Sequence, residues 1–413
     1  MDISTTDAVV EIISDNSSAT SYGKLSTFRK STHIISGIRK EIIECFIRLN
    51  IFRIIVSNIK NPVNWIRILL KLDQRRRKFS GESRIMKLAK VDGKYHWDLY
   101  IPAWPSKAFD EFIKAEINRI VPLKTNTNRF TNIFFAITKK CSLQCEHCFE
   151  WEALNKKEKL SADDIHQIIN TFQRYGTSQI QITGGEPMLR VKDILNELNS
   201  ADKKTEFWVL TSGYNFTEEN ATLLKTAGLK GVVISVDHFD PYRHNVFRGN
   251  MNSFKWVEDA VKNASAANLV IAFSICVTRE FVSMQNLFAY ASLAKNMGAA
   301  FIQILEPKPV GHYKDKNVLL EQSQLEVLEA FFWQMNYSGK YTDFPLVNYH
   351  GYYQRSTGCF AAGNRNLYVD TDGDLHACPF CHKKTGNVLS SDLAESICKL
   401  EKEGCMSFSV ADY

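Results

Sequence analysis

From Thr131 to about residue 336 the chain repeats one pattern six times, in which a short apolar run is followed by a segment with helical spacing of apolar residues. The pattern predicts strands near 132–137, 178–183, 206–211, 231–236, 269–277 and 300–305, and helices near 161–174, 190–200, 217–227, 252–267, 283–297 and 321–336. Strands that alternate with helices form parallel α/β sheets. With right-handed crossovers, six such units curl into an open, partial barrel whose active face lies at the carboxyl ends of the strands.

Three cysteines follow the first predicted strand and therefore lie on that face. Cys141, Cys145 and Cys148 are separated by three and then two residues. Thiolates this close together on one loop can converge on a single metal centre at little entropic cost. No fourth cysteine lies nearby in the sequence, and three thiolates on a four-iron cluster leave one iron open to a small molecule. We therefore expect chemistry at this loop.

The second predicted strand ends in a turn made of Gly184, Gly185, Glu186 and Pro187. The glycines expose backbone polar groups, Glu186 offers a carboxylate to an ammonium group, and Pro187 stiffens the turn. On local chemistry alone this is an ordinary strand-to-helix turn. Its position one strand away from the cysteine loop favours a functional interpretation.

Polar residues also follow the fourth predicted strand. Ser235 and Asp237 end that strand, and Arg248 comes shortly afterwards. Arginine suits a carboxylate because its planar fork can donate two hydrogen bonds at once. The alternative is that Ser235 and Asp237 cap the next turn while Arg248 forms a surface ion pair. Residues 211–213, after the third strand, are weaker candidates for the same site.

The C-terminal part of the chain carries a second group of cysteines. Cys359, Cys378 and Cys381 lie among glycines and short strand-like runs such as 366–369. The two-residue spacing between Cys378 and Cys381 suits tetrahedral zinc as well as an iron–sulfur cluster. Spacing alone does not separate the two metals.

The N-terminal part has a different character. Residues 1–33 are rich in Ser and Thr and predict a poorly ordered tail. Basic and apolar residues interleave from 34 to 78, Pro62 divides this stretch into two helices, and Asp92-Gly93 predicts a hairpin within 85–105. The helices are either an extension packed on the enzyme with solvated charges or a surface that contacts an anionic membrane. We expect four parts: the tail 1–33, the extension and hairpin 34–125, the core 126–340 and a small module 341–413.

Length and charge narrow the class of protein. The 413 residues, 45% of them hydrophobic, suffice for an enzyme-sized core. A formal net charge of +6 does not require a nucleic-acid role. The sequence shows no basic and apolar signal peptide and no run of eighteen apolar residues, so we expect a cytoplasmic protein, either free or peripheral to the inner face of the membrane.

The cysteine loop and the Gly-Gly-Glu-Pro turn together resemble the radical S-adenosylmethionine (radical SAM) superfamily over residues 130–310. The resemblance implies a [4Fe-4S] cluster on Cys141, Cys145 and Cys148, with S-adenosylmethionine chelating the open iron. It further implies cofactor contacts from the rest of the predicted face, namely Gly184, Gly185, Glu186, Pro187, Ser235, Asp237 and Arg248. An electron donor such as flavodoxin or ferredoxin would reduce the cluster. His147 departs from the family, which usually has an aromatic residue at this position.

The C-terminal cysteines resemble the SPASM/Twitch-like extension that binds an auxiliary [4Fe-4S] cluster in many radical SAM enzymes. The resemblance implies one cluster of the shorter type on Cys359, Cys378 and Cys381. For the fourth ligand we favour Cys405, which follows Gly404, over Cys398, which lies in a helix-like run. If neither binds, substrate could ligate the open iron. Cys45 and Cys276 are expected to be structural.

The expected activity is reductive cleavage of S-adenosylmethionine to a 5′-deoxyadenosyl radical, followed by hydrogen abstraction from a substrate. The auxiliary module favours a peptide, with oxidation or bond formation as the outcome. A small polar or lipid-linked substrate is the alternative, the latter because of the basic helices. A non-catalytic electron carrier or sensor would explain the cysteines but not the Gly-Gly-Glu-Pro turn and the six-unit barrel.

Overall fold

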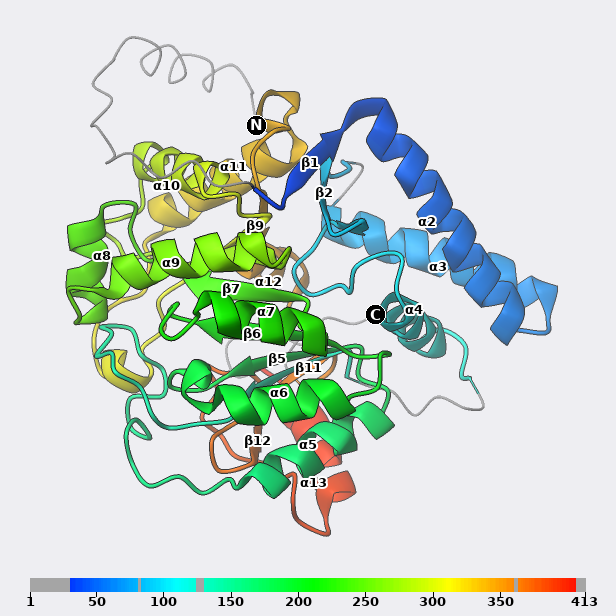
Figure 1. Ribbon diagram of the computed structural model, residues 1–413. Coiled ribbons are helices and arrows are strands. Elements are labelled where there is room, and N and C mark those ends of the chain that lie inside the picture. Colours follow the sequence, from blue (N-terminus) through cyan, green and yellow to red (C-terminus); the bar gives the residue numbers. More distant parts are fainter. Residues whose placement is uncertain (1–29, 81–82, 124–129, 360–362, 406–413) are drawn as a thin grey trace.

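The computed structural model describes residues 30–80, 83–123, 130–359 and 363–405. Its centre is a ten-stranded sheet in the order β10-β9-β8-β7-β6-β5-β4-β11-β12-β13 (Figure 1). Neighbouring strands are parallel from β10 to β11 and antiparallel from β11 to β13. The partial α/β barrel predicted from the sequence is therefore present.

All six predicted strands are found. They are β4 (Asn132–Ala136), β5 (Gln179–Thr183), β6 (Glu206–Thr211), β7 (Gly231–Ser235), β8 (Val270–Cys276) and β9 (Phe301–Leu305). Most of their residues are buried because both faces of the sheet are covered, which is why each strand is a continuous apolar run rather than an alternating one.

The six predicted helices are also found. They are α5 (Ala162–Arg174), α6 (Val191–Ser200), α7 (Glu218–Ala227), α9 (Ser253–Ala266), α10 (Met284–Asn296) and α11 (Gln322–Tyr337). A capping box of Ser161 and Asp164 begins α5. In Figure 1, α5, α6, α7 and α9 cover one face of the sheet.

Several elements were not predicted. Helix α8 (Pro241–Arg248) follows β7, and strand β10 (Leu346–Tyr349) extends the parallel sheet beyond β9, followed by α12 (His350–Thr357). At the other edge the strand predicted at 366–369 is confirmed as β11 (Asn366–Val369), but its parallel pairing with β4 was not predicted. Pairing between strands so far apart in the chain leaves no local signal in the sequence.

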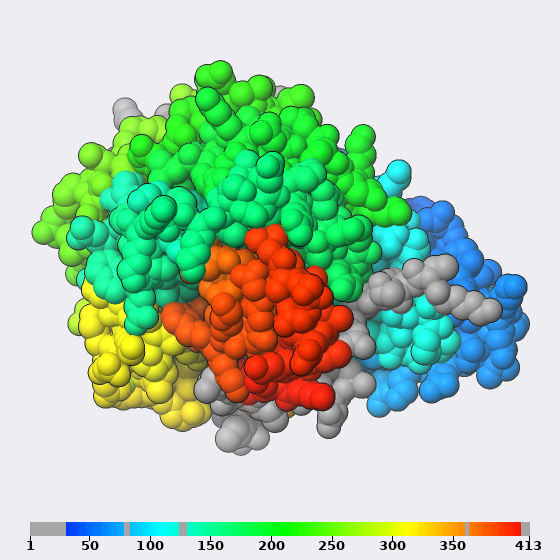
Figure 2. Space-filling model, turned by 90° about the horizontal axis from the view of Figure 1, so that it is seen from below, coloured from blue at the N-terminus to red at the C-terminus, as the bar shows by residue number. Residues whose placement is uncertain are grey.

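The C-terminal segment continues the core sheet through β11. Strands β12 (Asp374–His376) and β13 (Gly386–Asn387) follow antiparallel, and α13 (Leu393–Glu403) contacts both. Seen from below, this segment lies against the core at one side of the molecule while the N-terminal helices lie at another (Figure 2). The division into domains at residues 125 and 340 stays a prediction, and β10 lies after the second boundary although it belongs to the core sheet.

The N-terminal part contains β1 (His33–Ser36), α2 (Gly37–Asn58), α3 (Pro62–Ser80), β2 (Lys87–Val91), β3 (Lys94–His96) and α4 (Lys107–Asn118). The predicted hairpin at Asp92-Gly93 and the division at Pro62 are confirmed. Residues 1–29 lie outside the described residues. The predicted tail extends too far, because Ser31 is buried and its backbone N–H donates to the Ser265 hydroxyl. Among the described residues, no helix is long and apolar enough to cross a membrane.

Candidate active-site cavity

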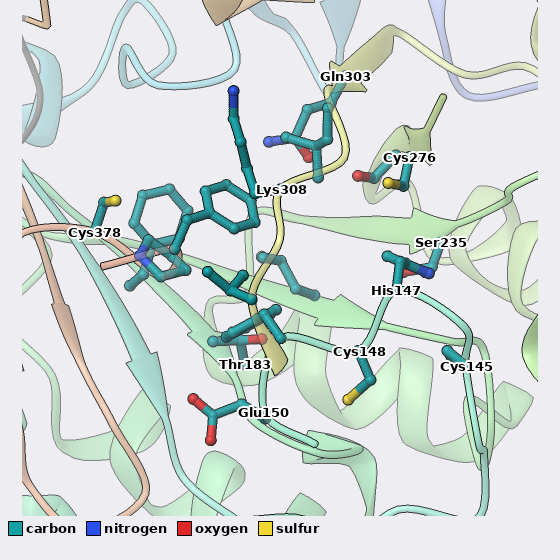
Figure 3. Close-up of a pocket in the computed structure, with 18 of the residues that line it drawn as sticks. Cys145, His147, Cys148, Glu150, Thr183, Ser235, Cys276, Gln303, Lys308 and Cys378 are labelled. Carbon is teal, nitrogen blue, oxygen red and sulfur yellow. The ribbon is translucent and has the colours of Figure 1, made fainter. Parts of the chain in front are cut away.

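A cavity of about 790 Å³ lies where the strands β4 to β9 end at their carboxyl termini. Its lining includes all but one of the predicted site residues: Cys141, Cys145, Cys148, Gly184, Gly185, Glu186, Ser235, Asp237, Arg248, Cys359, Cys378, Cys381 and Cys405. The exception is Pro187, which is buried at the start of a short 3-10 helix, Pro187–Arg190. Figure 3 shows Cys145 and Cys148 on one side of this cavity and Cys378 on the other.

The cysteine loop is held on one side by the end of α8. The backbone N–H of Gln144 donates to the carbonyl of Arg248 at 3.2 Å, and that of Glu146 donates to the carbonyl of Phe247 at 3.1 Å. The His147 ring stacks on Phe247 with centroids 5.0 Å apart. The imidazole therefore packs as a flat ring at the position where the family usually has an aromatic residue. Burial lowers the pKa of His147 to about 4, which keeps this ring neutral.

A second brace, which was not predicted, comes from the segment after β9. The backbone N–H of His312 donates to the carbonyl of Cys148 at 2.9 Å, and its ring nitrogen Nδ1 lies 2.9 Å from the carbonyl of Cys145. Trp151 stacks on the same ring at 3.8 Å. Gly311 has a φ of +59°, and a Cβ there would lie 2.2 Å from the carbonyl oxygen of Cys148. Only glycine allows this approach.

The glycine turn is locked to the start of the cysteine loop. Gly185 donates its N–H to the carbonyl of Thr138, and Glu186 donates to that of Lys140, both at 2.7 Å. A Cβ on Gly185 would lie 2.3 Å from the carbonyl oxygen of Lys140 and 3.1 Å from Cβ of Cys141. The two sequence motifs therefore form one rigid unit.

The Glu186 carboxylate is buried and holds the end of β6. It accepts hydrogen bonds from the Thr211 hydroxyl at 2.7 Å and from the Ser212 N–H and hydroxyl at 2.8 and 2.6 Å. Burial raises its pKa even though these donors favour the charged form. Residues 211 and 212, the weaker candidates, thus belong to the same network as Glu186.

Asp237 and Arg248 form a buried ion pair with Oδ2 and Nε 2.5 Å apart. Nη1 of Arg248 also donates to Sγ of Cys145 at 3.5 Å. Burial alone would raise the pKa of Asp237, but the Arg248 charge, the two neighbouring imidazoles and the N–H of Cys276 together outweigh it, and the pKa is lowered. The alternative of a surface ion pair and a capping aspartate is wrong, because Asp240 caps α8 and Asp237 accepts from the N–H of Cys276.

Burial raises the pKa of the first group of thiols, to about 11 for Cys141 and about 12 for Cys148. Iron would lower these values, because it binds the thiolate and displaces the proton. Three thiols that face one cavity from a single braced loop are a donor set that suits an iron–sulfur cluster.

The second group of thiols is assembled from separate segments. Cys359 follows α12, Cys378 and Cys381 lie in a turn after β12, and Cys405 follows α13. Burial raises the pKa of Cys378 to about 11, with further contributions from Cys381 and Cys405. Cys398 is exposed on α13. Within the described parts of the chain, no three metal-binding side chains stand close enough together to hold a single ion.

Of the two cysteines that were predicted to be structural, one is exposed and one is buried. Cys45 is exposed on α2, so its expected structural role is wrong. Cys276 is buried in β8 as predicted, but its side chain also lines the cavity (Figure 3).

Some polar residues of the cavity were missed. Glu306 and Lys308 follow β9, and Glu306 accepts from Lys308 Nζ at 3.2 Å and from the Tyr349 hydroxyl at 2.8 Å. Their place directly after a predicted strand was a usable signal. Glu150, which accepts from the Tyr368 hydroxyl, carried no such signal because it lies in a loop.

Comparison with known proteins identifies the region that holds the first cysteine loop. The model of the radical SAM superfamily matches residues 135–283. The chain is 37% identical to the GTP 3′,8-cyclase of Limosilactobacillus fermentum over 138 residues, 32% of this chain and 40% of the relative. It is 26% identical to the mycofactocin maturase MftC of Mycobacterium tuberculosis over 275 residues, 64% of this chain and 68% of the relative.

Solved structures of similar fold include two that contain a peptide. Streptococcus suis SuiB bound to its precursor peptide SuiA superposes with a TM-score of 0.53 at 14% identity, covering 70% of this chain and 68% of SuiB. The enzyme anSMEcpe with AdoMet and the Cp18Cys peptide gives a TM-score of 0.51 at 18% identity, covering 66% of this chain and 81% of that one. At these identities the likeness concerns the fold.

Proposed function

Because this chain is a radical SAM enzyme, we propose that it oxidises or cross-links a peptide with the help of an auxiliary iron–sulfur cluster. The observation that carries this proposal is that both cysteine groups line one cavity. A substrate in that cavity would lie between a site that generates a radical and a site that removes an electron. A simple electron carrier would not need the room between them.

The residues of the first site would each have a defined role. Cys141, Cys145 and Cys148 would hold the [4Fe-4S] cluster, which with bound S-adenosylmethionine supplies a radical able to take hydrogen from carbon. Gly184 and Gly185 let the turn lie directly against residues 138–141, where any side chain would strike the backbone, and their exposed backbone would face the cofactor. Pro187 would fix the turn from outside the cavity.

The charged residues of this site would orient the cofactor. The Glu186 carboxylate, held by Thr211 and Ser212, would present one negative edge to the amino group of S-adenosylmethionine. Arg248 would face its carboxylate and Ser235 its ribose. Asp237 would keep Arg248 in place, because the buried ion pair fixes the guanidinium beside Cys145.

The second site would take one electron from the substrate. Cys359, Cys378, Cys381 and Cys405 would hold an auxiliary [4Fe-4S] cluster, which would supply an acceptor for one electron of the substrate radical while its proton leaves to solvent. Cys359 is buried and Cys378, Cys381 and Cys405 are half-buried, which would limit the access of water to the substrate radical. We expect flavodoxin or ferredoxin to supply the electron that starts the cycle.

The names of the relatives point to different classes of substrate. The names of some refer to GTP cyclisation, whereas MftC is a maturase and both solved structures above contain a peptide. The alignments with MftC and with GTP 3′,8-cyclases are of similar length, 275 and 285 residues, so they favour neither substrate class. The peptide proposal is supported by the cavity that reaches to the C-terminal module. A small polar molecule such as GTP is the second candidate.

The test uses the full chain, reconstituted anaerobically with iron and sulfide and reduced with dithionite. Methionine and 5′-deoxyadenosine should form from S-adenosylmethionine. A peptide is then synthesised with the sequence that a short reading frame beside this gene encodes. Its addition should increase 5′-deoxyadenosine severalfold and lower the peptide mass by two hydrogens. Stimulation by GTP and not by the peptide would contradict the peptide assignment.

A further inference from the structure

Helices α2 and α3 each have an inward face that is packed and an outward face that is not. On the inward side Ile43, Ile47, Ile54 and Ile55 of α2 belong to the core cluster that α4 completes. The inward faces therefore pack against α4 and β2 of the same N-terminal part. The same packing fixes which residues of each helix face outward.

The outward face of α2 carries a stripe of apolar side chains. Its exposed residues Ile38, Ile42, Cys45, Leu49, Phe52 and Val56 follow one another at intervals of four and three, so they lie on one side of the helix. Ile38 is 81% exposed and Leu49 58%. The stripe is about 27 Å long at 1.5 Å per residue.

Helix α3 adds a second apolar face. Val63, Ile66 and Leu70 are 72%, 64% and 67% exposed, and Phe52 contacts Trp65 edge-on where the two helices meet. In the described parts of the chain, ten of the eighteen exposed large hydrophobic side chains lie on these two helices. Exposed apolar surface of this extent usually marks a contact site.

The surroundings of this apolar surface are basic. On α2, α3 and the turn between them the exposed cations are Arg39, Arg48, Arg53, Lys60, Arg67, Lys71 and Arg77, whereas Glu41 is the exposed acid among the described residues there. Several cations form exposed ion pairs, such as Arg53 with Asp110 at 3.4 Å. Such pairs cost little to break. The surface therefore complements a negatively charged partner.

We propose that the outward faces of α2 and α3 lie on an anionic membrane surface. The apolar stripe would enter the boundary between headgroups and acyl chains, and the surrounding arginines and lysines would contact anionic headgroups. A second copy of the chain is disfavoured because pairing this face with itself would oppose the same cations. This proposal does not depend on the substrate.

The experiment is sedimentation of the full chain with vesicles. We expect binding to phosphatidylcholine vesicles that contain about 30 mol% phosphatidylglycerol, at least tenfold weaker binding to pure phosphatidylcholine, and weaker binding at about 0.5 M salt. The triple variant Ile38→Ser, Leu49→Ser, Leu70→Ser should lose at least about tenfold in partitioning. Neutralising Arg39, Arg67 and Lys71 to Gln should act in the same direction.

The matched control removes exposed apolar side chains elsewhere. Leu223, Val246 and Leu319 are 44%, 49% and 50% exposed on other elements, and their replacement by Ser should leave binding unchanged. Unchanged circular dichroism and cleavage of S-adenosylmethionine would show that each variant is folded. The proposal is overturned if the parent chain stays in the supernatant or if the helix variants bind like the parent. Loss of a dimer in those variants, seen by ultracentrifugation, would assign the face to a second copy instead.

Discussion

The two cysteine groups differ in how the chain brings them together. The first lies on one loop that α8, the glycine turn and His312 hold from three directions. The second is gathered from three segments, and its position depends on the pairing of β11 with β4. A site built on one braced loop can be recognised from sequence spacing, whereas a site assembled by tertiary pairing cannot be read so directly. The difference also predicts separate losses when each group is damaged.

The largest difference is expected from removing one thiol of each group. Cys145→Ala should abolish formation of 5′-deoxyadenosine, because the first cluster would lose one of its three ligands. Cys378→Ala should retain that reaction and lose conversion of the substrate. Chromatography of 5′-deoxyadenosine and mass spectrometry of the peptide measure the two outcomes. Equal loss of both activities in both variants would contradict separate roles for the two cysteine groups.

A large effect is also expected from Gly185→Ala. The new Cβ would lie 2.3 Å from the carbonyl oxygen of Lys140, so the cysteine loop must move. Displacement of catalytic groups by about 1 Å can cost about 10²-fold in rate, and we expect a loss of that order in cleavage of S-adenosylmethionine. Gly339→Ala is the matched control, since no atom lies within 4 Å of a Cβ there. A Gly185→Ala enzyme with parental activity would refute the rigid coupling of the two motifs.

The fourth ligand of the second group can be identified by comparing its two candidates. Cys405 lines the cavity, whereas Cys398 is exposed on α13. We expect Cys405→Ala to lower iron by up to about four atoms per chain and Cys398→Ala to leave it unchanged. Iron and labile sulfide analysis after reconstitution measures this. If only the Cys398 variant loses iron, Cys398 and not Cys405 is the fourth ligand.

The smallest effect is expected at His312, which braces the first loop without lining the cavity. His312→Ala removes a ring contact with the carbonyl of Cys145 and the stacking on Trp151. Loss of one such hydrogen bond costs about 1 kcal/mol, so cleavage should fall about fivefold and cluster loss in air should be faster. His312→Asn, which keeps a side-chain N–H donor, should recover part of the loss. Identical rates in the two variants would contradict a positioning role.

The sequence predicted the six strands and helices of the core because burial on both faces of a parallel sheet leaves a continuous apolar run in each strand. It also predicted most residues at the strand ends, since the carboxyl ends of parallel strands meet at one edge. It did not predict β10, the pairing of β11 with β4, or the His312 brace. These depend on contacts between distant segments, such as that between His312 and Cys148, which leave no periodic trace.

Whether one cavity holds two clusters is measured most directly in the full chain without the three cysteines of the first loop. The variant with Cys141, Cys145 and Cys148 all changed to Ala should be reconstituted and measured by iron analysis and Mössbauer spectroscopy. We expect about four irons per chain with the spectrum of a [4Fe-4S] cluster. Bound zinc, or no residual four-iron cluster, would contradict it.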